Sequence, residues 1–261
     1  MEIPYRRGEG AIGPLLSWMK KLVQSGIDFA YPRTCHWCAD LLPEEGNSSA
    51  RFCQKCCLAI VPVQPYRCQR CSAPVGPHLE TSRGCIHCRS HPGRYHQIVS
   101  LGAYLQELQK ACLLCKKPGR ASLANALTEL LIEQNRSTLI TWDSHLVIPV
   151  PHHWRDRLWS EHATVAISER LGQFLKRPVE RNLLLKVRRT RRQQQLPASA
   201  RKTNLQEAFR VCHPDRLKGK RVLLADDIVT TGITADRCAQ VLLKAGAVQV
   251  NVAVLARSIN S

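Results

Sequence analysis

The chain has 261 residues, of which 44% are apolar and 22% charged. It can therefore bury an ordinary core, and wholesale disorder is excluded. At about 150 residues per domain, one or two domains are expected. Its 38 basic residues exceed its 20 acidic residues and give a net charge of +18, which favours polyanionic partners such as nucleic acid or phosphorylated ligands.

Residues 1–34 are predicted to form an amphipathic helix followed by a lead-in segment. Leu15, Trp18, Met19, Leu22 and Val23 lie at helical spacing, and charged residues interrupt the apolar stretch around them. This pattern suits neither a secretory signal nor a membrane-spanning helix of about 20 residues. We therefore expect no membrane span and a location in the reducing cytoplasm.

Residues 35–95 are predicted to form a double zinc ribbon. Four C-x-x-C pairs form two units, C-x2-C-x14-C-x2-C and C-x2-C-x13-C-x2-C, offset by about 33 residues. Two such knuckles supply the four thiolates of a tetrahedral zinc site. A redox role for the pairs would need a thioredoxin-like βαβ context, which is absent here. The spacing leaves sequential and interleaved ligand pairing open. The eight predicted ligands of two structural zinc ions are Cys35, Cys38, Cys53, Cys56, Cys68, Cys71, Cys85 and Cys88.

A fifth C-x-x-C pair, Cys112 and Cys115, lies in a segment with helical periodicity that begins at Tyr104. Cysteine at such positions behaves as a small hydrophobic residue. We therefore predict that this pair packs in the core and binds no metal.

Residues 96–261 are predicted to form an α/β domain with a parallel sheet. Short apolar runs indicate strands, and longer periodic segments indicate helices. The predicted strands are 98–102, 146–150, 221–225 and 248–255. The predicted helices are 122–134, 161–175 and 235–245.

The segment from Val222 to Thr234 carries the strongest chemical signal. Four apolar residues precede Asp226 and Asp227, so the two carboxylates are expected at the carboxyl edge of the sheet, where open α/β folds bind ligands. Hydroxyls, Gly232 and the start of a helix follow, an arrangement that suits a phosphate. The pattern fits a ribose 5-phosphate, and the plain structural alternative is an Asx-rich turn that caps a helix. The candidate ligand-binding residues are Asp226, Asp227, Ile228, Val229, Thr230, Thr231, Gly232 and Thr234.

The densest run of positive charge includes Arg188, Arg189, Arg191 and Arg192, and no acidic residue occurs from 187 to 206. The neighbouring glutamines, proline and serine suggest a mobile loop. Such arginines could stabilise a departing pyrophosphate or neutralise DNA phosphates. A solvated basic loop is the third interpretation.

The segment from Val222 to Thr234 resembles the phosphoribosyl pyrophosphate (PRPP) signature of type I phosphoribosyltransferases. This resemblance implies that the paired acids hold the ribose 2′- and 3′-hydroxyls. It also implies that Thr230, Thr231, Gly232 and Thr234 hold the 5′-phosphate, with Mg²⁺ accompanying PRPP.

Zinc knuckles joined to such a domain resemble the ComF (competence protein F) family. The resemblance runs from about Phe29 to Arg257 and includes Lys116, the strand 147–151, and the spacing of residues 190–209. The family's R-G-F-N-Q element is absent after that strand, where Arg155 and Arg157 remain. The candidate pyrophosphate and loop contacts are Arg155, Arg157, Arg188 and Arg201.

The family resemblance implies a role in DNA uptake or processing, with single-stranded DNA and a helicase as partners. Two functions stay open. In the first, the protein binds PRPP with Mg²⁺ and transfers a phosphoribosyl group to an acceptor that the sequence does not name. In the second, it is a single-stranded nucleic-acid-binding or adaptor protein whose PRPP pocket is vestigial and has no turnover.

Overall fold

The computed structural model describes residues 18, 32–43, 51–61, 64–89, 93–151, 157–187 and 208–258. The chain divides into two compact units, Met1–Cys56 and Cys57–Ser261. Of the predicted N-terminal helix only Trp18 is described, in helical conformation. Helix α2 (Gln54–Ile60) begins in the first unit.

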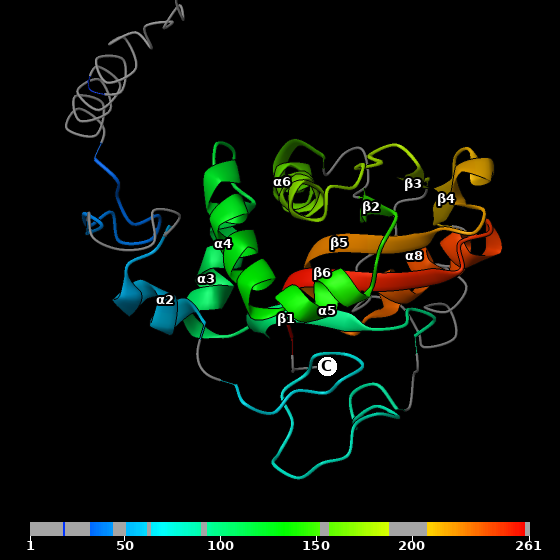
Figure 1. Cartoon of the computed structure of the whole chain (residues 1–261), viewed down its shortest axis with the longest axis horizontal. Helices are drawn as coiled ribbons and strands as arrows, with labels where there is room; N and C mark the ends of the chain where they lie inside the picture. Colours follow the sequence, from blue (N-terminus) through cyan, green and yellow to red (C-terminus); the bar gives the residue numbers. More distant parts are fainter. Residues whose placement is uncertain are drawn as a thin grey trace, which may run out of the picture. The chain divides into compact units, whose positions relative to one another are not determined.

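The second unit contains a four-stranded sheet in the order β1-β6-β5-β2 (Figure 1). All three strand pairings are parallel, which confirms the predicted sheet. The strands are β1 (Ile98–Ala103), β2 (Leu146–Pro149), β5 (Arg221–Val229) and β6 (Gln249–Arg257). Nearly every strand residue is buried, as expected for parallel strands covered on both faces.

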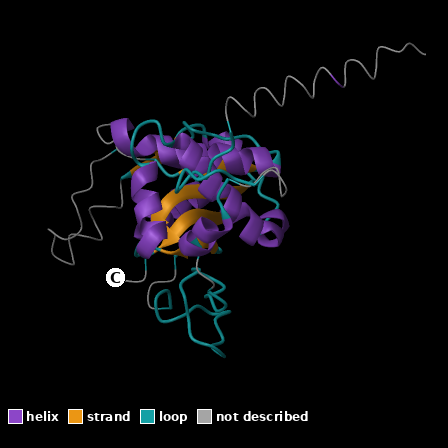
Figure 2. Ribbon diagram, turned by 90° about the vertical axis from the view of Figure 1, so that its left-hand side faces the viewer, coloured by secondary structure: helices purple, strands orange, loops and turns teal. Residues whose placement is uncertain are grey.

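Helices lie on both faces of this sheet (Figure 2). They are α3 (Gln106–Cys115), α4 (Ala121–Gln134), α5 (Arg136–Thr141), α6 (Arg157–Leu175) and α8 (Ile233–Lys244). Val222 and Leu224 of β5 share one hydrophobic cluster with Cys238 and Leu242 of α8. Side chains alternate along a strand, so the odd-numbered residues of this stretch of β5 face the opposite side.

Three further short elements were not predicted, because each has too few residues to show a periodic sequence pattern. The strands β3 (Leu184–Lys186) and β4 (Phe209–Val211) form an antiparallel pair, and η3 (Pro214–Leu217) is a single 3₁₀ turn. Cys112 and Cys115 are buried in α3, as predicted for core residues. No helix in the described part of the chain is long and apolar enough to cross a membrane.

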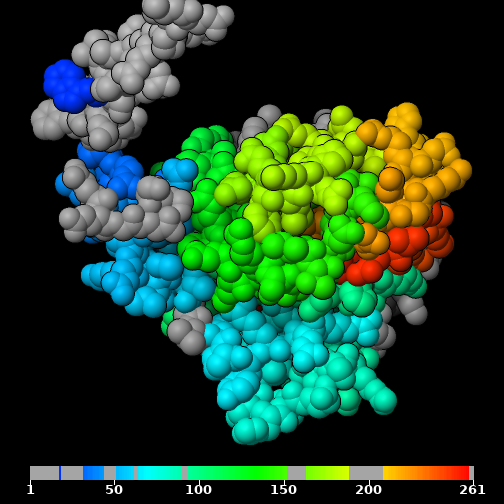
Figure 3. Space-filling view, in the orientation of Figure 1, coloured from blue at the N-terminus to red at the C-terminus, as the bar shows by residue number. Residues whose placement is uncertain are grey.

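The segment 64–89 also belongs to the second unit and covers the outer edge of β1. Arg67 donates to the carbonyls of Ser100 and Leu101 at 2.8 and 3.0 Å. Ile98 donates its amide to the Arg70 carbonyl at 2.8 Å. The unpaired groups of an edge strand thus find partners outside the sheet. In Figure 3 the segment is the cyan to blue-green lobe against the α/β body.

Candidate functional site: two cysteine clusters and an acidic strand end

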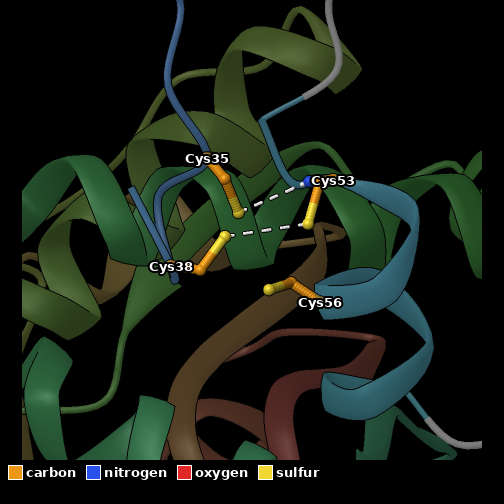
Figure 4. A group of neighbouring side chains, drawn as sticks. All are labelled: Cys35, Cys38, Cys53 and Cys56. Atoms are coloured by element: carbon orange, nitrogen blue, oxygen red, sulfur yellow. Dashed lines mark hydrogen bonds between the residues drawn. The ribbon is translucent and has the colours of Figure 1, made fainter. Parts of the chain in front are cut away.

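The first cysteine cluster consists of Cys35, Cys38, Cys53 and Cys56, whose sulfurs point toward one another (Figure 4). All four Sγ atoms lie within 4.8 Å of one another. Those of Cys38 and Cys53 are 3.8 Å apart. The amide of Cys53 also donates to the sulfur of Cys35 at 3.4 Å.

The second cluster, Cys68, Cys71, Cys85 and Cys88, has the same form and is buried. Its Sγ separations are 3.8 Å between Cys68 and Cys88 and 3.7 Å between Cys71 and Cys85. A zinc–sulfur bond of about 2.3 Å at tetrahedral angles requires sulfurs about 3.8 Å apart, so both clusters fit a zinc ion. The grouping is sequential, because each cluster draws its four cysteines from two consecutive C-x-x-C pairs.

The first knuckle of each cluster repeats one backbone design. The isolated bridges Thr34–Leu41 and Arg67–Pro74 are offset by the sequence repeat. Ala39 and Ser72 occupy equivalent places, and both have positive φ, 64° and 59°. The amide of each bonds the carbonyl of the cysteine that opens its knuckle, at 2.9 Å. The predicted internal repeat is therefore present in the fold.

The acidic pair lies inside β5. This strand was predicted to end at Ala225 but continues to Val229, because β6 keeps pairing with it: Asp226 pairs with Val254, and Val229 with Arg257. On the other side β2 ends at Pro149, opposite Ala225, and the amide of Val150 donates to the Ala225 carbonyl at 2.8 Å. The two acids thus lie where one neighbouring strand has already stopped.

The two carboxylates differ in their surroundings. Asp226 has the parity of Val222 and Leu224 and faces α8, and Asp227 faces the opposite side. They are 7% and 4% exposed. Each Oδ1 accepts from the next amide along the chain, at 2.9 and 2.7 Å. Burial and the neighbouring charge of Asp227 raise the pKa of Asp226 well above its usual value.

Lys116 is the partner of Asp227. It follows the last residue of α3, and its Nζ lies 2.9 Å from Asp227 Oδ2. Burial by itself would lower the pKa of Lys116, but the carboxylate of Asp227 outweighs this effect and raises it. From the sequence, Lys116 was identified only as part of a family resemblance. Its ion pair with the acidic pair was not predicted, and the structure shows it.

The loop after β5 leads directly into α8. Thr230, Thr231 and Thr234 are exposed, and Gly232 has a φ of 81°, which few residues other than glycine adopt. A helix start presents unpaired amides and a positive dipole end. This stretch therefore offers hydroxyls and amides to an anion.

Arg257, at the end of β6, was not expected from the sequence. It is 2% exposed, and its Nη1 donates to the Val229 carbonyl at 3.2 Å, just before the threonine loop. Its Nε has no hydrogen-bond partner in the described part of the chain. An arginine at the end of a buried apolar strand is the signal that could have revealed it.

Most of the predicted pyrophosphate contacts lie outside the described residues. This holds for Arg155, Arg188 and Arg201, and for the basic run as a whole. Arg157 begins α6, and its side chain is not described. The structure thus brings together Asp226, Asp227 and the threonine loop.

Comparisons with known proteins relate the chain to a domain family, to curated relatives and to solved structures. Residues 170–260 match the family described as "Phosphoribosyl transferase domain". The chain is 31% identical over 199 residues to DNA utilization protein YhgH of Salmonella typhi, covering 74% of this chain and 84% of that protein. It is 27% identical over 229 residues to competence protein F of Haemophilus influenzae, covering 86% and 96%. Among solved structures, purine phosphoribosyltransferase from Pyrococcus horikoshii Ot3 shares 20% identity over 50% of this chain and 73% of its own, with a TM-score of 0.35.

Proposed function

Because this chain belongs to the ComF (competence protein F) family, we propose that its phosphoribosyltransferase-type domain binds PRPP with Mg²⁺ in the service of DNA uptake or processing. The observation that carries the proposal is the continuous run from two buried carboxylates in β5, through an exposed threonine loop, into the start of α8. Acids suited to ribose hydroxyls and donors suited to a phosphate thus follow one another along a single turn.

Each group has a distinct task in this proposal. The carboxylates of Asp226 and Asp227 accept hydrogen bonds from the ribose 2′- and 3′-hydroxyls at the open edge beyond β2. Thr230, Thr231, Thr234 and the amide of Gly232 donate to the 5′-phosphate. Carboxylate and phosphate oxygens are the ligands that Mg²⁺ prefers, so the donors present fit this ion, which would neutralise the pyrophosphate as it leaves.

The two acids start from different surroundings. The raised pKa of Asp226 favours its protonated form in the free protein, whereas the carboxylate of Asp227 forms an ion pair with Lys116. A carboxylate accepts hydrogen bonds from both ribose hydroxyls better than a carboxylic acid does. Binding is therefore expected to release a proton from this pair.

Transfer of the phosphoribosyl group to an acceptor is the enzymatic form of this proposal. The departing pyrophosphate would need cationic partners, for which Arg155, Arg157, Arg188 and Arg201 stay our candidates. The family's R-G-F-N-Q element is missing, so binding without turnover is the alternative. Eight thiolate ligands require a reducing compartment, which favours the cytoplasm.

A calorimetric titration of Mg²⁺–PRPP into the zinc-loaded protein tests the binding site. The Asp226→Asn/Asp227→Asn variant should lose at least tenfold in affinity, since two charge-assisted contacts disappear. Asp215→Asn is the matched control, because Asp215 is exposed on η3. Absence of binding to the folded parent, or equal affinities in all three proteins, would refute the proposal.

Single-stranded DNA is the second candidate ligand, favoured by the net charge of +18 and by the names of the relatives. Fluorescence anisotropy with a labelled strand should show affinity that falls steeply with salt and with alanine at Arg188, Arg189, Arg191 and Arg192. The control variant removes the same charge from exposed sites elsewhere: Lys110, Arg136, Lys176 and Lys218. Equal losses in both variants would mean that net charge alone binds the strand. A helicase partner stays a prediction of the family resemblance.

A further inference from the structure

A polar cavity lies at the other end of the sheet from the acidic pair. It has a volume of about 690 Å³ and is bounded by the knuckle of Cys68 and Cys71, the lead-in to β1 and the start of β6. Val250 lies four residues before Val254, the β6 partner of Asp226. At about 3.3 Å per residue, some 13 Å of strand separates this cavity from the acids.

Two arginines line the cavity. Arg70 and Arg94 border it together with His96, and no lining residue is acidic. Arg70 donates from Nη2 to the Gly93 carbonyl at 2.9 Å. Its Nε is buried without a hydrogen-bond partner among the described residues. Because an arginine side chain is always charged and no carboxylate lines the cavity, an anionic ligand is favoured there.

Size and composition narrow the ligand further. Small-molecule sites typically measure about 300–1,000 Å³, so this cavity exceeds what inorganic phosphate alone would fill. Gln69, Gln97 and Gln249 border the cavity with amide side chains, and Leu243 and Val248 supply apolar surface. Of these amides, Gln97 already accepts from Trp142 Nε1 at 3.1 Å and Gln249 already donates to Asn251 at 3.4 Å. Cationic side chains suit a phosphate, amides suit the hydrogen-bonding edge of a base, and apolar side chains suit its flat face. Together these groups favour a mononucleotide as the ligand.

Two lining residues connect this cavity to the threonine loop. The backbone amide of Arg94 donates to Asp236 Oδ1 at 2.7 Å, and its guanidinium lies 3.0 Å from Oδ2. Asp236 is in the first turn of α8. Tyr95 is buried, and a Cβ placed on Gly232 would lie 3.2 Å from its hydroxyl. A change in the conformation of residues 94–95 would therefore alter their contacts with Asp236 and Gly232, next to the threonine loop.

We propose that the cavity between the knuckle of Cys68 and Cys71 and the start of β6 binds a mononucleotide through Arg70 and His96. Its occupancy is transmitted to residues 230–236 through Arg94 and Tyr95. The bound nucleotide orders the lead-in to β1 and, through the Asp236 and Gly232 contacts, the loop next to the acidic pair. Such a site would adjust PRPP binding to the supply of nucleotides, a consequence that rests on the proposed function.

The test is calorimetric titration of the zinc-loaded full chain with AMP, GMP, CMP and UMP, one at a time, and with inorganic phosphate. Arg70→Gln/His96→Gln should weaken nucleotide binding at least tenfold, and His96→Gln alone should weaken it by a smaller factor. Arg83→Gln/His87→Gln is the matched control from the same ribbon, outside the lining set. Zinc content and circular dichroism establish that each variant is folded.

Nucleotides could also enter the proposed PRPP site, so Asp226→Asn/Asp227→Asn is measured in parallel and should bind nucleotide normally. The proposal is overturned if that variant loses nucleotide binding while Arg70→Gln/His96→Gln retains it. It is equally overturned if no nucleotide binds, or if inorganic phosphate binds as tightly as every nucleotide.

Transmission to the loop is read by hydrogen–deuterium exchange of residues 230–236. Saturating nucleotide should slow exchange there at least threefold, and Tyr95→Phe should reduce that protection. Unchanged exchange at full occupancy would exclude the connection. This measurement needs no PRPP, so its failure is distinct from failure of the proposed function.

Discussion

Lys116 gives the sharpest test of how the acidic pair is held in the free protein. Its Nζ lies 2.9 Å from Asp227 Oδ2, and the side chains are 35% and 5% exposed. At an effective dielectric constant of about 20, that separation corresponds to roughly 6 kcal/mol of gross attraction. Desolvation of both groups and the partial exposure of Lys116 offset much of it.

Lys116→Met should therefore lower the free energy of unfolding by about 2–3 kcal/mol at alkaline pH. The reason is that two buried carboxyl groups would remain without a cation. The neighbouring Lys117 is exposed, and Lys117→Met, the matched control, should change stability by less than about 0.5 kcal/mol. The double variant Lys116→Met/Asp227→Asn should recover most of the loss, because it removes the charge left unpaired.

The destabilisation should also depend on pH. Asp226 has a pKa raised by burial and by Asp227, and the charge of Lys116 opposes that rise. Without Lys116 the pKa rises further. A carboxyl group whose pKa is higher in the folded state favours folding as the pH falls, so the loss should shrink on acidification.

Urea unfolding of the zinc-loaded proteins, followed by circular dichroism at about pH 8.5 and about pH 6.5, measures both effects. A Lys116→Met variant as stable as Lys117→Met at the higher pH would refute the reasoning. So would a loss that grows on acidification.

Three further predictions concern other parts of the molecule. Elemental analysis should find two zinc ions per chain, one for each cluster, and Cys71→Ser should reduce this to one; two ions in that variant would contradict the ligand assignment. Arg67→Ala should lower the free energy of unfolding by about 2–3 kcal/mol, because two carbonyls of β1 lose a charged donor, while Arg83→Ala, from the same ribbon, should have little effect. The affinity for Mg²⁺–PRPP should rise with pH, by at most about tenfold per unit, until Asp226 is fully ionised; an affinity independent of pH in the parent would argue against this carboxyl as a ligand.

Local patterns predicted most of the α/β domain. The parallel sheet followed from apolar runs such as 146–150, and the helices from their periodicity. The length of β5 was underestimated because its last residues are held by pairing with β6 rather than by their own hydrophobicity. The small β3–β4 pair was missed because three-residue strands carry little periodicity.

The candidate site was predictable to a similar degree. Spacing identified the cysteine clusters, since a C-x-x-C turn carries its geometry in a few consecutive residues. The roles of Lys116 and Arg257 depend on contacts between distant segments. Lys116 and Asp227 are more than 100 residues apart in the chain, and Arg257 and Val229 are 28 residues apart. Such pairings arise from tertiary packing, and no local pattern encodes them.

The position of β6 has a consequence for how the domain is built during synthesis. This strand lies between β1 and β5, yet it is the last element of the sheet to be made. At roughly 5–20 residues per second, β1 leaves the ribosome about 8–30 s before its partner. The ribbon segment 64–89 precedes β1 in the chain and supplies Arg67 to its outer edge. In the nascent chain, the ribbon segment can thus cover the outer edge of β1 against wrong strand pairing before β6, which pairs with the inner edge, has been synthesised.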